Sequence, residues 1–244
     1  MTVSIRTSLV FSAVALAALC AAFANPPVAE GATEPESHAS ADSACLTGRQ
    51  QSPIDLTGAI ASGVDAPHPA WTTAHGGAVV NTGHTIQVDL ADAGSIQLNG
   101  VSYTLKQFHF HHPSEHTIDG KSFPLEVHLV HAASDGRLAV VGVLFEEGAA
   151  NETLDAVWAT APARSGKAAV AFEIDAASFV PKSGGALRYE GSLTTPPCSE
   201  TVSWTVMGTP QTASHAQIQA FAALFPNNAR PVQPLNRRYV VKTP

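Results

Sequence analysis

The stretch Gln107-Phe108-His109-Phe110-His111 alternates polar and aromatic residues. Because successive side chains of a β-strand point to opposite faces, its two histidines share one face with the glutamine, and its two phenylalanines point to the other. The run Glu126-Val127-His128 repeats this alternation, with its histidine on the same face as its glutamate. If the two runs pair as antiparallel strands, three imidazoles converge on one side of a sheet, and the apolar residues enter a core on the other.

The three histidines, His109, His111 and His128, are the residue types of a catalytic zinc site. Such a site uses three protein ligands and leaves a fourth position open, whereas a structural zinc site fills all four, usually with thiolates, and no cysteine lies near this cluster. A metal-bound histidine also needs an acceptor for its second ring nitrogen, and Gln107 and Glu126 each precede a histidine by two residues on its face. An isolated His-x-His pair would indicate only a half-exposed strand. The third histidine and the two acceptors favour a metal site.

Several separate motifs resemble those of the α-class carbonic anhydrases of bacterial type, over nearly the whole chain from Cys45 to Arg238. Besides the two histidine runs, they are Gln51-Ser52-Pro53-Ile54, Asn81-Thr82-Gly83-His84, Pro113-Ser114-Glu115-His116-Thr117, Gly191-Ser192-Leu193-Thr194-Thr195-Pro196-Pro197-Cys198 and Asn228-Ala229-Arg230-Pro231-Val232-Gln233-Pro234-Leu235-Asn236. The resemblance implies a zinc lyase that reversibly hydrates carbon dioxide to bicarbonate and a proton. It also implies inhibition by sulfonamides and anions.

Short β-rich runs separated by Gly, Asn, Asp and Pro predict a mainly β protein, with strands at residues 79–80, 85–90, 95–98, 103–111, 125–131, 138–145 and 201–207. Helical patterning is confined to residues 152–160 and 214–224, the second with Ser214 as its N-cap. The resemblance implies a central, twisted, mostly antiparallel sheet of about ten strands, with the metal at the bottom of a conical cleft.

The length and the net charge of the chain limit the number of domains and the classes of partner. A chain of 244 residues with 45% hydrophobic content and no internal repeat predicts one domain, the catalytic domain at residues 45–244. A net charge of −7 argues against nucleic acid and against anionic membrane surfaces as partners. The expected partners are therefore small-molecule substrates. The sequence does not distinguish a monomer from a homodimer.

Residues 1–24 predict a cleavable export signal, because Arg6 is followed by an apolar run that ends in Ala22-Phe23-Ala24. A membrane anchor is the weaker alternative, since about 16 apolar residues fall short of the roughly 20 that span a bilayer. Lipidation of Cys20 is a second alternative, disfavoured by the large Leu19 before it. Residues 25–44 have no apolar periodicity and predict a flexible leader. The expected location is periplasmic or secreted, without a membrane anchor.

Removal of the signal leaves an even pair of cysteines, Cys45 and Cys198, in an oxidising compartment. This predicts a disulfide that closes a loop of about 150 residues and braces the Leu193-Thr194-Thr195 segment over the proposed metal. The resemblance to bacterial enzymes implies the same pairing.

The resemblance also assigns catalytic roles, with zinc-bound hydroxide attacking carbon dioxide. Thr194 would accept the hydroxide proton and donate its own to Glu115, although a Thr-Pro turn and a surface carboxylate are plain alternatives. His84 would carry protons to buffer, because the pKa of histidine suits a shuttle near neutrality. The implied proton wire is Asn81, Thr82 and Gln87, and Asn228 joins Gln107 and Glu126 behind the metal ligands.

Carbon dioxide is apolar and needs an apolar wall beside the metal, although each wall residue could equally be ordinary core. The substrate-binding residues implied by the resemblance are Val130, Val140, Leu193, Thr194, Thr195, Val202 and Trp204. Two functions of other classes stay open: a carbonic-anhydrase-like binding module without catalysis, and a periplasmic metal-binding protein. Weak ester hydrolysis could accompany hydration.

Overall fold

The computed structural model describes residues 44–64, 66–170 and 172–244. The expected export signal at 1–24, the leader up to residue 43, and Cys20 lie outside the described residues. Within the described ranges, no helix is both long and apolar enough to cross a membrane.

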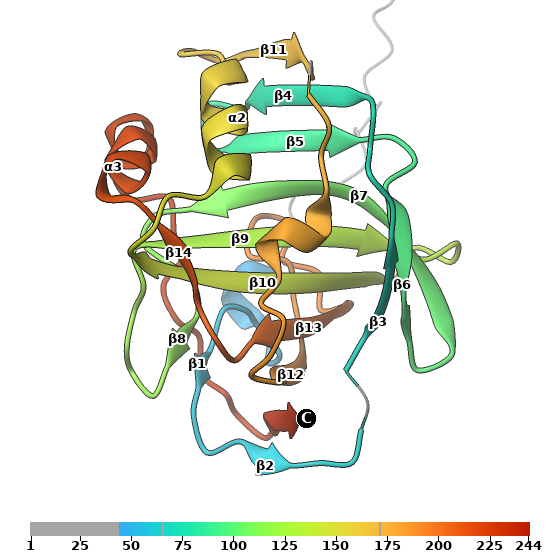
Figure 1. Ribbon diagram of the computed structural model, residues 1–244. Helices are drawn as coiled ribbons and strands as arrows, with labels where there is room; N and C mark the ends of the chain where they lie inside the picture. The colour runs from blue at the N-terminus through green and yellow to red at the C-terminus, as the bar shows by residue number, and fades with distance from the viewer. Residues whose placement is uncertain (1–43, 65, 171) are drawn as a thin grey trace, which may run out of the picture. The chain divides into compact units, whose positions relative to one another are not determined.

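A sheet of 13 strands dominates the described chain (Figure 1). Ten strands follow one path in the order β11 (Gly166–Ala169), β4 (Gly77–Asn81), β5 (Ile86–Leu90), β7 (Val101–His111), β9 (Leu125–Ala132), β10 (Leu138–Glu147), β13 (Val202–Met207), β12 (Ala186–Gly191), β15 (Val241–Thr243) and β2 (Ile60–Ala61). Off this path, β14 (Gln211–Ala213) pairs with β10, and β6 (Gly94–Leu98) pairs with both β3 (His68–Trp71) and β7. A separate small sheet joins β1 (Asp55–Leu56) to β8 (Thr117–Ile118).

Most strand pairs in the large sheet are antiparallel, and the exceptions are β10 with β13, β10 with β14, and β15 with β2. The expected mainly β fold with a large, mostly antiparallel sheet is therefore confirmed. The seven predicted strands correspond to β4, β5, β6, β7, β9, β10 and β13. The remaining strands and the 3₁₀ helix η1 (Ala176–Phe179) were not predicted.

Both predicted helices are present and begin at side-chain caps. Helix α2 (Glu152–Thr160) follows Asn151, whose side chain accepts hydrogen bonds from the backbone N–H groups of Thr153 and Leu154. Helix α3 (His215–Leu224) follows Ser214, which forms a reciprocal capping box with Gln217. These caps satisfy backbone donors that a helix N-terminus otherwise leaves unpaired.

The helices cover one face of the sheet. Buried residues of α2, α3 and η1 pack in one core with the apolar face of β7 and β9, which includes Phe108, Phe110, Val127 and Leu129. Figure 1 shows α2 lying across β4 and β5. The polar residues of β7 and β9 therefore face the other side, where a second apolar cluster includes Val140 and Trp204.

A bulge in β7 lies just before the alternating run that begins at Gln107, so core residues precede and follow it. The pairing of β7 with β9 shifts between Leu105 and Gln107, so Lys106 has no partner across the strand pair. Leu105 and Phe108 are both buried in the core, and the two residues between them both point away from it. After the bulge, the strand carries Gln107, His109 and His111 on one side without a gap.

The Cys45–Cys198 disulfide is present, with its Cα atoms 5.1 Å apart across a sequence separation of 153. The backbone N–H of Cys198 donates to the carbonyl of Thr195 at 2.9 Å. Gln51 donates from Nε2 to the carbonyl of Cys198 at 3.1 Å. The crosslink and these bonds hold the segment that carries Thr194 and Thr195.

Candidate metal centre and active-site cleft

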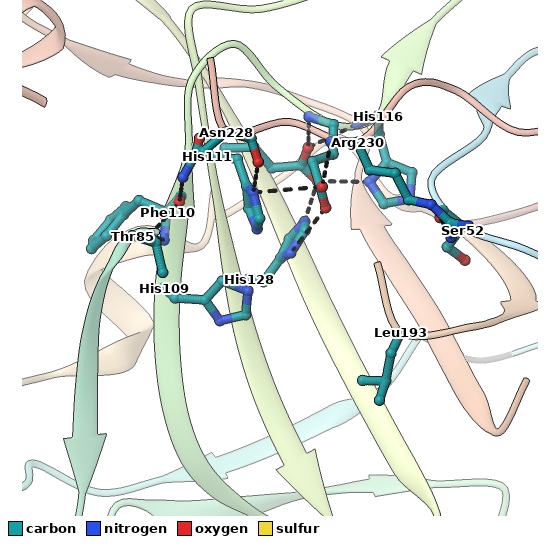
Figure 2. Close-up of polar contacts among 12 residues, drawn as sticks. Ser52, Thr85, His109, Phe110, His111, His116, His128, Leu193, Asn228 and Arg230 are labelled. Carbon is teal, nitrogen blue, oxygen red and sulfur yellow. Dashed lines mark hydrogen bonds and ion pairs between the residues drawn. The ribbon is translucent and has the colours of Figure 1, made fainter. Parts of the chain in front are cut away.

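Antiparallel pairing of β7 with β9 brings the three histidines together. His109 lies directly opposite His128, and His111 is the next residue along the same face of β7. One ligand nitrogen of each ring lies within 4.8 Å of the others. Figure 2 shows the three rings converging from the two neighbouring strands. The convergence expected from the alternation of side chains is therefore observed.

Hydrogen bonds hold the outer nitrogen of each ring. His109 Nδ1 lies 2.9 Å from Gln107 Oε1, and His111 Nδ1 lies 3.4 Å from the carbonyl of Asn228. His128 Nε2 lies 2.9 Å from Glu126 Oε1. Because all three partners are acceptors, each of these ring nitrogens must carry the proton and donate it. The opposite nitrogens are then unprotonated lone-pair donors that face one another.

Burial keeps the imidazoles of His109 and His111 neutral. Desolvation, with His128 as the next cause, lowers the pKa of His109 from 6.5 to about 3. The same two causes lower the pKa of His111 well below its ordinary value. His111 Nε2 is buried and has no hydrogen-bond partner among the described residues. An unsatisfied buried nitrogen is costly, and a cation at the meeting point of the rings would satisfy it. The donor set therefore fits zinc.

The Glu126 carboxylate is fully buried and accepts four hydrogen bonds. Oε2 accepts from the backbone N–H groups of Glu115 and His116 at 2.8 and 2.9 Å. Oε1 accepts from His116 Nδ1 at 2.7 Å and from His128 Nε2 at 2.9 Å. Burial opposes ionisation most strongly, but His116 and His128 outweigh it and lower the pKa of Glu126 well below its ordinary value. The cluster of His116, Glu126 and His128 is thus joined by hydrogen bonds and holds the His128 ring.

His116 continues this network away from the metal centre. Its Nε2 lies 2.7 Å from the Tyr189 hydroxyl, which donates to Ser52 Oγ at 2.9 Å. Ser52 Oγ in turn accepts the backbone N–H of Ser192 at 3.0 Å. The Gln-Ser-Pro-Ile motif is therefore linked by buried hydrogen bonds to the strand that carries His128.

Glu115 is buried beside the histidines. Its Oε1 accepts the backbone N–H of Arg230 at 2.8 Å, and its Oε2 is buried without a hydrogen-bond partner among the described residues. Burial raises the pKa of Glu115 to about 7, and the contacts with Arg230 and Thr194 oppose that rise. Glu115 is therefore a buried acceptor and not a surface charge. Thr194 is near enough to lower its pKa, and a hydrogen bond between the two side chains stays a prediction.

A cleft of about 220 Å³ opens above the three histidines. Apolar residues line one side: Val130, Val140, Leu193 and Trp204. Val130, Val140 and Trp204 lie at one level on three adjacent strands, because Val140 pairs with both of the others. Thr194 and Thr195 also line the cleft, whereas Val202 is buried in the second apolar cluster and is not among the lining residues.

The other side of the cleft is polar and includes Thr82, His84 and Gln87. His84 is exposed, and its backbone N–H donates to Thr82 Oγ1 at 3.2 Å. Asn81 does not line the cleft; its amide donates to the carbonyl of Pro162 and accepts from Gly83, so it shapes the turn before His84. Gln87 donates from Nε2 to Asp89 at 2.7 Å, which leaves its amide oxygen as the remaining acceptor.

The sequence interpretation gave no role to several residues that build the site. Arg230 holds Glu115 through its backbone, and its guanidinium binds Gln51 and the carbonyls of Ser52 and Cys45. Thr85 lines the cleft and donates to the carbonyl of Phe110 at 2.6 Å. Arg230 stands inside a quoted motif, so the signal was present, but a backbone contact has no side-chain signature in a sequence.

Three imidazoles that could hold one metal ion lie below a cleft with one apolar and one polar wall, on a mainly β scaffold. This arrangement is typical of metalloenzymes whose metal is open to substrate.

Comparison with known proteins identifies the family. The profile of the eukaryotic-type carbonic anhydrase family matches residues 33–244. A carbonic anhydrase of Nostoc sp. is 44% identical over 207 residues, which cover 81% of this chain and 77% of that protein. The α-carbonic anhydrase of Photobacterium profundum superposes with a TM-score of 0.79 at 40% identity, covering 82% of this chain and 92% of that one. The enzyme of Thermovibrio ammonificans, solved with the inhibitor sulfanilamide, gives 0.79 at 41% identity, covering 83% and 91%. The chain belongs to the α-carbonic anhydrase family and is an enzyme of that family.

Proposed function

We propose that the chain hydrates carbon dioxide reversibly with a zinc ion held by His109, His111 and His128. The observation that carries this proposal is the proton arrangement of the three rings, each of which donates outward to an acceptor and keeps its inner nitrogen free. In carbonic anhydrases themselves, zinc in such a set makes water a nucleophile at neutral pH. Gln107, Asn228 and Glu126 fix the ring orientations.

Thr194 and Glu115 are proposed to aim the nucleophile. Glu115 is held by the Arg230 N–H, and its second carboxylate oxygen, buried without a partner among the described residues, is proposed to accept the Thr194 hydroxyl. While that hydroxyl donates a hydrogen bond to Glu115, its oxygen can only accept one, so the nucleophile would donate a hydrogen bond to Thr194 and keep its proton. This leaves a lone pair directed into the cleft, and holding it there lowers the entropic part of the barrier.

The substrate is proposed to lie against the apolar side of the cleft, formed by Val130, Val140, Leu193 and Trp204. Water binds weakly to such a wall, so apolar carbon dioxide can displace it. Thr195 lies at the edge of this wall. Val202 supports it from behind, as part of the same apolar cluster as Trp204.

Protons are proposed to leave along the polar side of the cleft. His84 is exposed at this wall, where an imidazole can exchange protons with buffer, and Thr82 and Gln87 lie beside it. The bond from Gln87 to Asp89 leaves an amide oxygen as an acceptor for cleft water. Asn81 contributes indirectly through the turn that places His84.

The test is stopped-flow carbon dioxide hydration by the purified, zinc-loaded protein, with and without a sulfonamide, together with the zinc content. We expect inhibitable hydration at one zinc per chain. His109→Ala should lose zinc and hydration together, whereas His75→Ala, at an exposed histidine beside Glu173, should lose neither. Full zinc content without hydration would instead favour a non-catalytic binding module. Weak ester hydrolysis, measured in the same samples, should follow the zinc content.

Export is proposed from the sequence of residues 1–24 alone, with a periplasmic or secreted location. The Cys45–Cys198 disulfide fits an oxidising compartment. Mass analysis of the mature protein should give an N-terminus after Ala24, and an intact Met1 would contradict the proposal.

A further inference from the structure

A second hollow lies apart from the metal cleft and shares no lining residue with it. It has a volume of about 420 Å³ and is lined by Arg49, Gln50, Asn236, Arg237 and Arg238. Three arginines thus meet in one place on a chain whose net charge is −7. We propose that this hollow binds a small multivalent oxyanion of the phosphate type, through the guanidinium groups of Arg49 and Arg237.

The backbone ties these two arginines together, although they are far apart in sequence. Asn236 Nδ2 donates to the carbonyl of Arg49 at 2.8 Å, across a sequence separation of 187. Asn236 has a φ of 56°, a left-handed conformation that asparagine adopts more readily than most residues. Arg237 follows it directly. The same contact therefore fixes where both side chains leave the backbone.

Arg238 is held in place by the backbone and contributes positive charge to the hollow. Its Nε and two terminal nitrogens donate to the carbonyls of Leu235, Glu190 and Pro234 at 3.0, 3.1 and 2.9 Å. Its guanidinium also lies over the Tyr189 ring, 5.5 Å from the centroid. These three bonds use three of the five guanidinium N–H donors, and neutral carbonyls leave the positive charge in place. Arg238 therefore makes the potential in the hollow more positive and stiffens its wall.

The Glu200 carboxylate interacts electrostatically with Arg238, and its hydrogen bonds come from neutral donors. Its Oε1 accepts from the backbone N–H of Gln50 at 2.6 Å and from Gln51 Nε2 at 2.9 Å, and Arg49 contributes a backbone N–H. Within the described ranges, the guanidinium groups of Arg49 and Arg237 have no ion pair or hydrogen bond with the protein. Both residues line the same hollow, and a guanidinium binds phosphate through two parallel hydrogen bonds.

The size and the surroundings of the hollow favour a compact anion over a polyanion. A nucleic acid needs an extended basic surface that neutralises many phosphates, and the acidic net charge opposes that. A hollow of about 420 Å³ accommodates one phosphate with its bound water. A monovalent spherical anion such as chloride cannot engage both forks in parallel bonds.

The test is calorimetric titration of the zinc-loaded protein with inorganic phosphate at pH 7.5, with the ionic strength held constant by sodium chloride. We expect one saturable site in the wild-type protein. The Arg49→Gln/Arg237→Gln variant should bind phosphate at least tenfold more weakly and should keep its rate of carbon dioxide hydration. Arg164→Gln, at an exposed arginine outside the hollow, is the matched control and should bind phosphate like the wild type.

Two results would overturn the proposal: no phosphate binding by the wild-type protein, or equal binding by the double variant. Phosphate bound at the metal centre would give equal binding by the double variant, and that binding would be lost in His109→Ala. If the double variant unfolds, the single variant Arg237→Gln provides the test, because the Arg237 guanidinium has no hydrogen bond or ion pair with other described residues. Unchanged phosphate affinity in that single variant would refute the site.

Discussion

Replacing Glu126 by glutamine keeps the shape of the side chain but changes one acceptor oxygen into an NH₂ donor. The carboxylate now accepts from two backbone N–H groups through Oε2 and from two imidazoles through Oε1. In the variant, the amide oxygen can face only one of these pairs. The backbone donors cannot change, so we expect the oxygen to face them and the NH₂ to face the rings of His116 and His128.

An NH₂ group beside His128 Nε2 favours the tautomer that is protonated on Nδ1, the nitrogen that faces the other two histidines. That proton must be removed before a metal can bind, and we expect zinc affinity to fall about 10- to 100-fold. Two charge-assisted hydrogen bonds in a fully buried site are also lost. At roughly 1.5–3 kcal/mol each, the free energy of unfolding of the metal-free protein should fall by about 3–5 kcal/mol.

Zinc affinity would be measured by competition with a chelator, and stability by urea unfolding of the metal-free protein. Glu146→Gln is the matched control, because Glu146 is exposed at the end of β10. It should change neither quantity. If Glu126→Gln binds zinc as tightly as the wild type, the argument from tautomers is refuted, even if its stability falls as expected.

Three further predictions concern other parts of the chain. Burial lowers the pKa of His131 from 6.5 to about 4, so the unfolded chain takes up a proton first as the pH falls. The His131 contribution to the free energy of unfolding should drop by about 3 kcal/mol between pH 6.5 and pH 4. In urea titrations, His131→Gln should lose about 3 kcal/mol less stability over this pH range than the wild type. His84→Ala should lower kcat in weak buffer, leave kcat/KM unchanged and respond to added imidazole; equal kcat in all buffers would exclude the shuttle. Replacing Cys45 and Cys198 by serine should lower the free energy of unfolding by about 3–5 kcal/mol, and an unchanged urea midpoint would contradict the entropic argument for a loop of this length.

Local patterns predicted the long elements, because they carry their own periodicity. The alternation in β7 and β9 and the caps of α2 and α3 are visible in the sequence within a few residues. Short strands such as β2 and β15 are defined by pairing with segments far along the chain, which no local pattern reports. Strand β12 was missed because Arg188 is buried at a position that reads as polar surface.

The inner part of the site was predictable from residue type and spacing, and the outer part was not. Three histidines on one face of paired strands, with Gln107 and Glu126 behind them, follow from alternation alone. The second contact of Glu126, with His116, depends on how the loop after β7 folds back. The hydrogen bond from the Arg230 backbone N–H to Glu115 joins segments 115 residues apart. Contacts of this kind become visible only in three dimensions.

Anomalous diffraction at the zinc absorption edge, from crystals of the zinc-loaded protein, tests the metal centre most directly. We predict one peak, bonded to His109 Nε2, His111 Nε2 and His128 Nδ1 at about 2.0–2.1 Å, with a non-protein fourth ligand. A peak elsewhere, or zinc with a fourth protein ligand, would contradict the proposed catalytic centre.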